Sequence, residues 1–148
     1  VSLPEGFDIS GWDTSNVTNM SFMFWHGSLP SNFNLSDWDT SSVTTMGYMF
    51  ADATTSTSLN ISGWDTSSVI LMESMFSNVI LPDGFNISGW DTSNVITMTF
   101  MFYNATLPSV FDLRSWNVLT ITSKPYNFGN FSAADQHEPV WGTDGSGG

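Results

Sequence analysis

Residues 12–24 read WDTSNVTNMSFMF, and three near copies of this stretch begin at residues 38, 64 and 90. A tryptophan opens each copy, and five tryptophans follow one another in steps of 26, at positions 12, 38, 64, 90 and 116. A fixed period of roughly 20–50 residues is typical of stacked arrays, in which each copy buries its apolar side against its neighbours. We therefore expect the chain to coil into stacked turns.

The pattern within one copy predicts its secondary structure. Ahead of the tryptophan, residues 7–10 (FDIS) alternate apolar and polar side chains, which indicates a half-buried strand. The Asp-Thr-Ser that follows the tryptophan is typical of a helix start. Over residues 17–24, Val, Met, Met and Phe then recur at spacings of three and four, which places them on one side of a short helix. All eight methionines lie in these two columns and are expected in the core.

These patterns predict an α/β repeat, a leucine-rich-repeat-like parallel β-solenoid with one short strand and one short helix per turn. The solenoid of about five repeats should cover residues 1–123. The fifth copy is degenerate, because Lys124 stands where a methionine is expected and Pro125 follows it. Terminal repeats are commonly atypical, so residues 124–141 are expected to form a C-terminal cap. The Gly-rich residues 142–148 are expected to be a flexible linker or tail.

Charge and composition exclude several classes of partner. The 148 residues include fourteen acids and two bases, with a formal net charge of −12. Nucleic acids and anionic membranes both require clustered Lys and Arg, so neither is an expected partner. The chain has no cysteine, which removes disulfides and thiolate chemistry. No stretch approaches the roughly 20 apolar residues of a membrane span, so we expect no membrane insertion by this segment.

The string over residues 12–24 resembles the bacterial surface protein 26-residue repeat, a BspA-like, leucine-rich-repeat-like family of surface proteins and lipoproteins. The resemblance extends from residue 1 to about residue 116 and rests on the motif W-D-T-S-x-V-x-x-M-x-x-M-F. It implies a module displayed on a cell surface, extracellular, and engaged in adhesion or in contact with a host or matrix. It supplies no catalytic residues and no cofactor. The chain begins inside a repeat, and we expect it to be part of a longer protein.

No enzymatic activity is expected, because active sites need a few unique converging groups and nearly every polar residue here is a repeat position. The acids recur once per repeat. The favoured interpretation of this aspartate column is that each carboxylate accepts backbone N–H groups at the following helix start. A metal bound between turns is a weaker hypothesis, since calcium takes 6–8 oxygen ligands. The column consists of Asp13, Asp39, Asp65 and Asp91.

Two surfaces are candidates for ligand binding. The first is the outward side of the predicted strands, an almost uncharged set of amides and hydroxyls comprising Asn34, Asn60, Asn86, Ser36, Ser62 and Ser88. Such groups both donate and accept hydrogen bonds. The second is a set of exposed aromatic side chains, because exposed apolar stripes mark interaction surfaces. One aromatic column holds Phe22, Tyr48 and Phe100, with Ser74 interrupting it, and a second holds Trp25 and Tyr103.

The sequence thus predicts a non-catalytic adhesion or ligand-binding module of a larger bacterial surface protein. Its partner would be a protein or a glycan on a host, a matrix or a neighbouring cell, and the strand side is the first candidate for the contact. A structural spacer is the main alternative. Calcium binding and ice binding are further alternatives, the latter through the regular column of Thr14, Thr40, Thr66 and Thr92.

Overall fold

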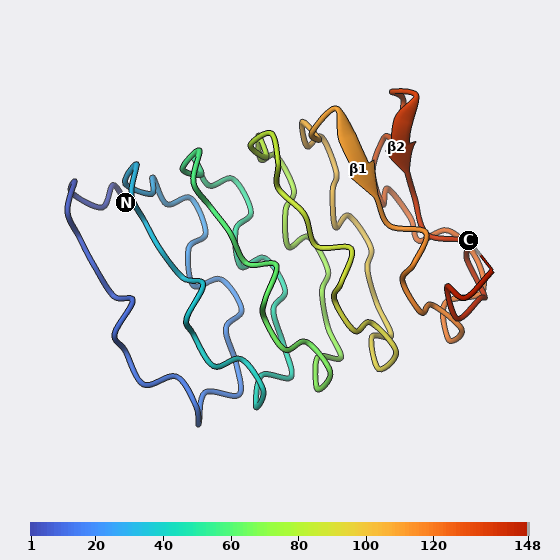
Figure 1. Cartoon of the computed structure of the whole chain (residues 1–148), viewed down its shortest axis with the longest axis horizontal. Helices are drawn as coiled ribbons and strands as arrows, with labels where there is room; N and C mark the ends of the chain where they lie inside the picture. The colour runs from blue at the N-terminus through green and yellow to red at the C-terminus, as the bar shows by residue number, and fades with distance from the viewer. Residues whose placement is uncertain (148) are drawn as a thin grey trace.

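The computed structural model describes residues 1–147 as a coil of stacked turns. Figure 1 shows successive turns of the chain side by side along the long axis, from the N-terminal to the C-terminal end. Parallel bridges join residues one repeat apart, as in Ser2 with Ser28 and Ser28 with Thr54, or Asn19 with Thr45 and Thr45 with Leu71. One 26-residue repeat is therefore one turn of the coil.

The predicted secondary structure of each turn is wrong. No helix occurs within residues 1–147, and the strands there are β1 (Val110–Asp112) and β2 (Asp135–His137). These two strands pair in parallel, with Val110 opposite Asp135. The fold is therefore not an α/β repeat with one strand and one helix per turn. Each turn consists of short extended segments joined by β-turns, and a regular strand pair forms where the fifth copy meets the C-terminal segment.

Residues 20–27 form consecutive β-turns in place of the predicted helix. The N–H groups of Met20, Phe22 and Phe24 donate to carbonyls of the next turn, at distances of 2.9–3.1 Å. The N–H groups of Met23, Trp25 and Gly27 donate three residues back, as Met23 does to Met20, whereas the Ser21 N–H donates to Asn19 Oδ1 at 2.8 Å. An α-helix would send every N–H four residues back. Phe22 and His26 have φ values of 62° and 55°, which a right-handed helix excludes. We call the equivalent segments 20–27, 46–53, 72–79 and 98–105 the turn ladder.

The predicted strands fail for a different reason. Residues 33–36 lie between two β-turns, closed by bonds from Phe33 to the Pro30 carbonyl and from Trp38 to the Leu35 carbonyl. Along this segment no backbone hydrogen bond to a neighbouring turn occurs within residues 1–147. The indole N–H of Trp64 instead donates to the Leu35 carbonyl at 2.9 Å. A side chain of the next turn therefore replaces the ladder bond that a strand would make.

The core is built from columns of identical side chains. Trp38 and Trp64 stack with ring centroids 6.5 Å apart, and Phe50 and Phe76 stack at 5.6 Å. The tryptophans thus share one column, as the period predicts. Seven of the eight methionines are buried, which confirms their predicted place in the core. Met23 and Trp12, on the outer side of the first turn, are exposed.

The C-terminal residues close the other end of the coil. Phe131 and Trp141 pack against Phe128, whose carbonyl accepts the N–H of Phe102. Residues 142–143 lie against Val118 through two backbone hydrogen bonds, one in each direction. The part of the predicted tail at residue 148 lies outside the described residues. No described segment is a helix long and apolar enough to cross a membrane.

Candidate functional site

The amide and hydroxyl side chains predicted on the strand side lie along one surface, but in Asx turns. Asn34 Oδ1 accepts the N–H of Ser36 at 2.9 Å and its hydroxyl at 2.7 Å. Asn60 and Ser62 make the same two contacts. We call this set, with the equivalent residues of the other turns, the Asx rows. Their carbonyl oxygens are bound within their own repeat, whereas no hydrogen bond from an asparagine Nδ2 in these rows occurs within residues 1–147.

The aspartate column repeats the same geometry one corner further along the turn. Asp39 Oδ1 accepts the N–H and the hydroxyl of Ser41, at 3.0 and 2.6 Å. The interpretation of these carboxylates as acceptors of backbone N–H groups is confirmed, although the N–H belongs to a turn and not to a helix. The Ser41 hydroxyl and then its N–H lower the pKa of Asp39. Within residues 1–147, no three His, Asp or Glu side chains gather to hold a metal ion.

The threonine column lies inside the coil. Thr40 and Thr66 are buried, and the hydroxyl of Thr40 donates to the Asp65 carbonyl of the next turn at 3.0 Å. The same bond recurs from Thr14, Thr66 and Thr92. These hydroxyls tie adjacent turns together, so they present no regular surface to ice.

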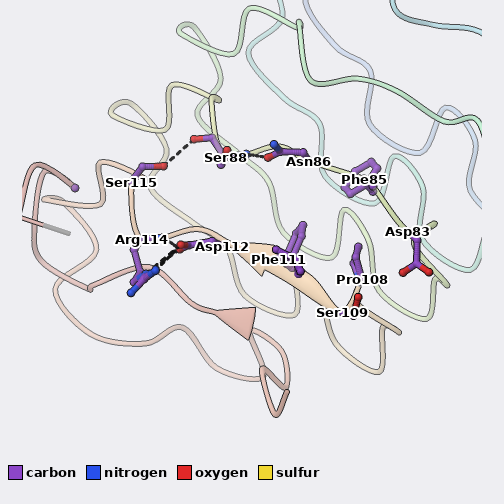
Figure 2. Close-up of a pocket in the computed structure, with 13 residues that line it drawn as sticks. Asp83, Phe85, Asn86, Ser88, Pro108, Ser109, Phe111, Asp112, Arg114 and Ser115 are labelled. Atoms are coloured by element: carbon purple, nitrogen blue, oxygen red, sulfur yellow. Dashed lines mark hydrogen bonds and ion pairs between the residues drawn. The ribbon is translucent and has the colours of Figure 1, made fainter. Parts of the chain in front are cut away.

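On the surface of the Asx rows, a groove of about 640 Å³ lies between the fourth and fifth copies of the repeat. Figure 2 shows Asn86 and Ser88 on one side of it and Asp112 and Arg114 on the other. Arg114 donates to both carboxylate oxygens of Asp112, with Nη2 at 2.6 Å from Oδ2. This bond lowers the pKa of Asp112 to about 2. Because Arg114 is already paired, the groove offers no free cation to an anionic ligand.

Of the aromatic side chains predicted from the sequence, those of Phe22, Trp25, Tyr48 and Tyr103 are exposed on the turn ladder and that of Phe100 is half-buried. Phe22 and Tyr48 stack with centroids 4.7 Å apart and planes 6° from parallel. Trp25 meets Phe22 edge to face at 5.7 Å. The exposed fractions of Phe22, Trp25 and Tyr48 are 51%, 48% and 36%. In the next turn Ser74 takes the column position and is buried, so the aromatic surface is interrupted there.

A second aromatic group occupies the C-terminal end of the same surface. Phe100 meets Tyr103 edge to face at 5.4 Å and Tyr126 edge to face at 5.3 Å. Tyr126 is 71% exposed and is not among the candidate residues predicted from the repeat motif. Its signal was its place 26 residues after Phe100 in the degenerate fifth copy. The carbonyl of Tyr126 accepts the N–H of Phe100, which fixes this contact.

A polar row runs beside the aromatic side chains. Asn104 Nδ2 donates to Asn78 Oδ1 at 2.9 Å, and Asn78 Nδ2 donates to Asp52 Oδ1 at 2.8 Å. His26 Nε2 lies 3.8 Å from the other oxygen of Asp52. All four residues are exposed. The turn ladder therefore combines exposed rings with a row of amide and carboxylate groups.

These features define a repeat protein made of stacked 26-residue turns whose outer columns carry exposed aromatic and polar side chains. The family model described as a Mycoplasma protein of unknown function, DUF285, matches residues 4–81 and, a second time, residues 58–141. The chain belongs to this family. No curated protein and no solved structure gives a match to the chain.

Proposed function

We propose that this chain is a non-catalytic ligand-binding module of a bacterial cell-surface protein, acting in adhesion. The observation that carries the proposal is the exposure of clustered aromatic rings on the turn ladder. Large rings are normally buried, and a contiguous exposed group of them marks an interaction surface. The resemblance of residues 12–24 to the bacterial surface protein 26-residue repeat supports the extracellular location and the adhesive role.

The turn ladder is a better candidate for the contact than the Asx rows. In the Asx rows the side-chain carbonyl oxygens already accept two hydrogen bonds each in Asn34 and Asn60. A partner would find there mainly the amide N–H groups. On the turn ladder, half-exposed rings of Phe22 and Trp25 remain available for contact. Apolar area removed from water is the general source of binding free energy.

A structural spacer is the second candidate, and one observation favours it. The polar side chains of the outer rows are largely bound to one another or to their own repeat, as in the chain from Asn104 through Asn78 to Asp52. A spacer requires polar side chains that are hydrogen-bonded within the protein, and it does not require exposed aromatic rings. The two candidates therefore differ in what the rings of the turn ladder do.

Adhesion of the purified protein distinguishes the two. We expect coated surfaces of the protein to retain host cells or matrix in a concentration-dependent way. The variant Phe22→Ser, Trp25→Ser, Phe100→Ser and Tyr103→Ser should lose most of this retention. Ser74 and Ser77 occupy the same two columns in another turn, so serine is accommodated there. A matched variant, Asn60→Arg with Asn86→Arg, should retain adhesion. Retention no greater than that of an unrelated acidic protein would favour the spacer.

A further inference from the structure

The two aromatic groups, on the turn ladder and beside its C-terminal end, occupy equivalent positions of the repeat. The N-terminal trio is Phe22, Trp25 and Tyr48, and the C-terminal trio is Phe100, Tyr103 and Tyr126. Each member of the second trio stands 78 residues, or three repeats, after its counterpart in the first. In the intervening turns the same columns hold Ala51, Ser74 and Ser77. Aromatic rings are therefore not a requirement of the fold at these positions, and they recur as complete sets.

Two rings of each trio are placed in the same way by the backbone. An edge-to-face pair comes from one β-turn, in which the N–H of Trp25 donates to the Phe22 carbonyl and that of Tyr103 to the Phe100 carbonyl, both at 3.1 Å. The planes of the two pairs meet at 78° and 75°. The third ring comes from the following turn of the coil, and its placement differs: Tyr48 stacks on Phe22 with planes 6° apart, whereas Tyr126 meets Phe100 edge to face at 76°. Each trio thus forms an angled surface, with one ring standing beside the face of another.

The surroundings of the trios are polar, and no unpaired Lys or Arg side chain of residues 1–147 lies there. His26 and Asp52 adjoin the N-terminal trio, and the ring of Trp25 lies 4.3 Å from that of His26. Beside the C-terminal trio, a hollow of about 280 Å³ is lined by Tyr103 and by the amides Asn104, Asn127 and Asn130. This volume is near the lower end of small-molecule sites, which start at about 300 Å³.

Charge decides which ligands suit this surface. Arg114 pairs with Asp112, and Lys124 lies 2.8 Å from Glu138. These two residues are the only bases of the sequence, whose formal net charge is −12. Phosphorylated, sulfated and uronic-acid ligands would meet repulsion with no compensating ion pair. The occupant must therefore be uncharged or weakly cationic.

From these observations we infer that each of the two trios is a binding site for neutral sugar rings, and that one neutral polysaccharide chain occupies both. The axial C–H groups of a pyranose pack on the electron-rich face of an aromatic ring, and its hydroxyls pair with amides that both donate and accept. A repeating polymer is the partner that presents the same unit twice. This inference rests on the proposed binding function and specifies its ligand.

Titration calorimetry with defined saccharides tests the inference. The probes are trisaccharides of glucose, of mannose, of N-acetylglucosamine and of galacturonic acid, together with the corresponding polymers. We expect at least one neutral trisaccharide to bind at two sites per chain and the galacturonate trisaccharide not to bind. Serine at all three positions of the N-terminal trio should leave one site of unchanged affinity. For the polymer, the same change should weaken binding by about 100-fold or more, because the two sites no longer act together.

The controls separate this inference from the proposed function. Ile96→Ser removes an exposed apolar side chain outside both trios and should change neither the stoichiometry nor the affinity of saccharide binding. Equal melting temperatures of the variants and the parent exclude unfolding as the cause of lost binding. Adhesion that persists while no neutral saccharide binds overturns the glycan inference and leaves the binding function standing. Adhesion that depends on the trios but is not inhibited by any of the saccharides assigns the surface to a protein partner. This result also overturns the glycan inference. Saccharide binding at a single site, unaffected by changes in either trio, overturns it as well.

Discussion

Adjacent turns of the coil are connected by different bonds on the two sides of the coil. On the turn ladder, backbone N–H groups such as that of Phe50 donate to carbonyls of the next turn. On the side of the Asx rows, no such ladder forms along residues 33–36 within the described chain, and the indole of Trp64 supplies the bond instead. The spacing differs accordingly. Ring centroids are 5.6 Å apart for Phe50 and Phe76, but 6.4 Å for Trp64 and Trp90.

This difference shows where the sequence is free to change. Backbone bonds do not depend on side-chain identity, so an outward position of the turn ladder can be Phe22, Tyr48 or Ser74 without loss of the inter-turn contact. On the other side the connecting group is itself a side chain, and tryptophan occupies its position in all five copies. Variation on the turn ladder is therefore available for function, which is why we place the binding surface there.

The largest expected effect comes from removing one indole. Trp64→Ala deletes a 4% exposed ring, its stacking on two neighbours and its bond to the Leu35 carbonyl. Truncation of a buried aromatic costs about 3–5 kcal/mol, and the carbonyl loses a partner in addition. The free energy of unfolding, measured in urea, should fall by at least this amount.

Trp12→Ala is the matched control for that change. Trp12 is 56% exposed, and no acceptor for its indole N–H lies within residues 1–147. It stacks on Trp38 from one side. The loss of unfolding free energy should therefore be less than half of that for Trp64→Ala. Equal losses at the two positions would show that the indole bonds do not hold this side of the coil.

An intermediate effect is expected on the turn ladder, where the backbone conformation is the sensitive quantity. Ser74 has a φ of 54°, and left-handed backbone costs about 1–2 kcal/mol for a residue with a Cβ. Ser74→Gly should raise the free energy of unfolding by about 1 kcal/mol, less the entropy that glycine adds to the unfolded chain. Ser74→Val should lower it, because a β-branched residue is a strong outlier in this region. Thermal unfolding of the two variants checks the order, and a more stable valine variant would contradict it.

Much of the architecture could be predicted from the sequence. The period gives one turn per repeat, the Trp and Met columns lie in the core, and the rings of Phe22 and Trp25 are exposed. The sequence could not show that the predicted helix is absent, since consecutive β-turns also give apolar spacings of three and four. A left-handed backbone conformation is usually indicated in the sequence by glycine, but here Phe22, His26 and Tyr48 adopt it. Their conformation is set by bonds to the next turn, which no single repeat contains.

The sequence predicted only part of the candidate site. Columns follow from the period alone, so Phe22, Tyr48 and Phe100 could be grouped without a structure. Tyr126 stands in the same column but was missed, because Pro125 and Lys124 break the motif around it. The alternation at residues 33–36 did place Asn34 and Ser36 on the outside. It could not reveal that Asn34 Oδ1 is bound by Ser36, since an Asx turn and a strand both turn these side chains outward.

The smallest effect is expected at the corner that both sides share, where Asp39 accepts two bonds from Ser41. These bonds lower the pKa of Asp39 below its usual value of 3.8. A carboxyl whose pKa is lower in the folded than in the unfolded state stabilises the fold above the unfolded value. That contribution is lost as the pH falls from about 4 through the folded pKa. Asp39→Asn keeps an oxygen acceptor but does not titrate.

The free energy of unfolding of Asp39→Asn should therefore match the parent at pH 7 and fall less steeply below pH 4. The neighbouring Asp13 carboxylate, which raises the pKa of Asp39 slightly, reinforces the expectation, because the variant removes their repulsion. Urea unfolding at both pH values measures the difference. Ser41→Ala is the informative partner, since it removes the hydroxyl that contributes most to the lowered pKa. Its stability should fall at pH 7 and depend less on acid, whereas an unchanged acid dependence in both variants would place the acid-sensitive contacts elsewhere in the coil.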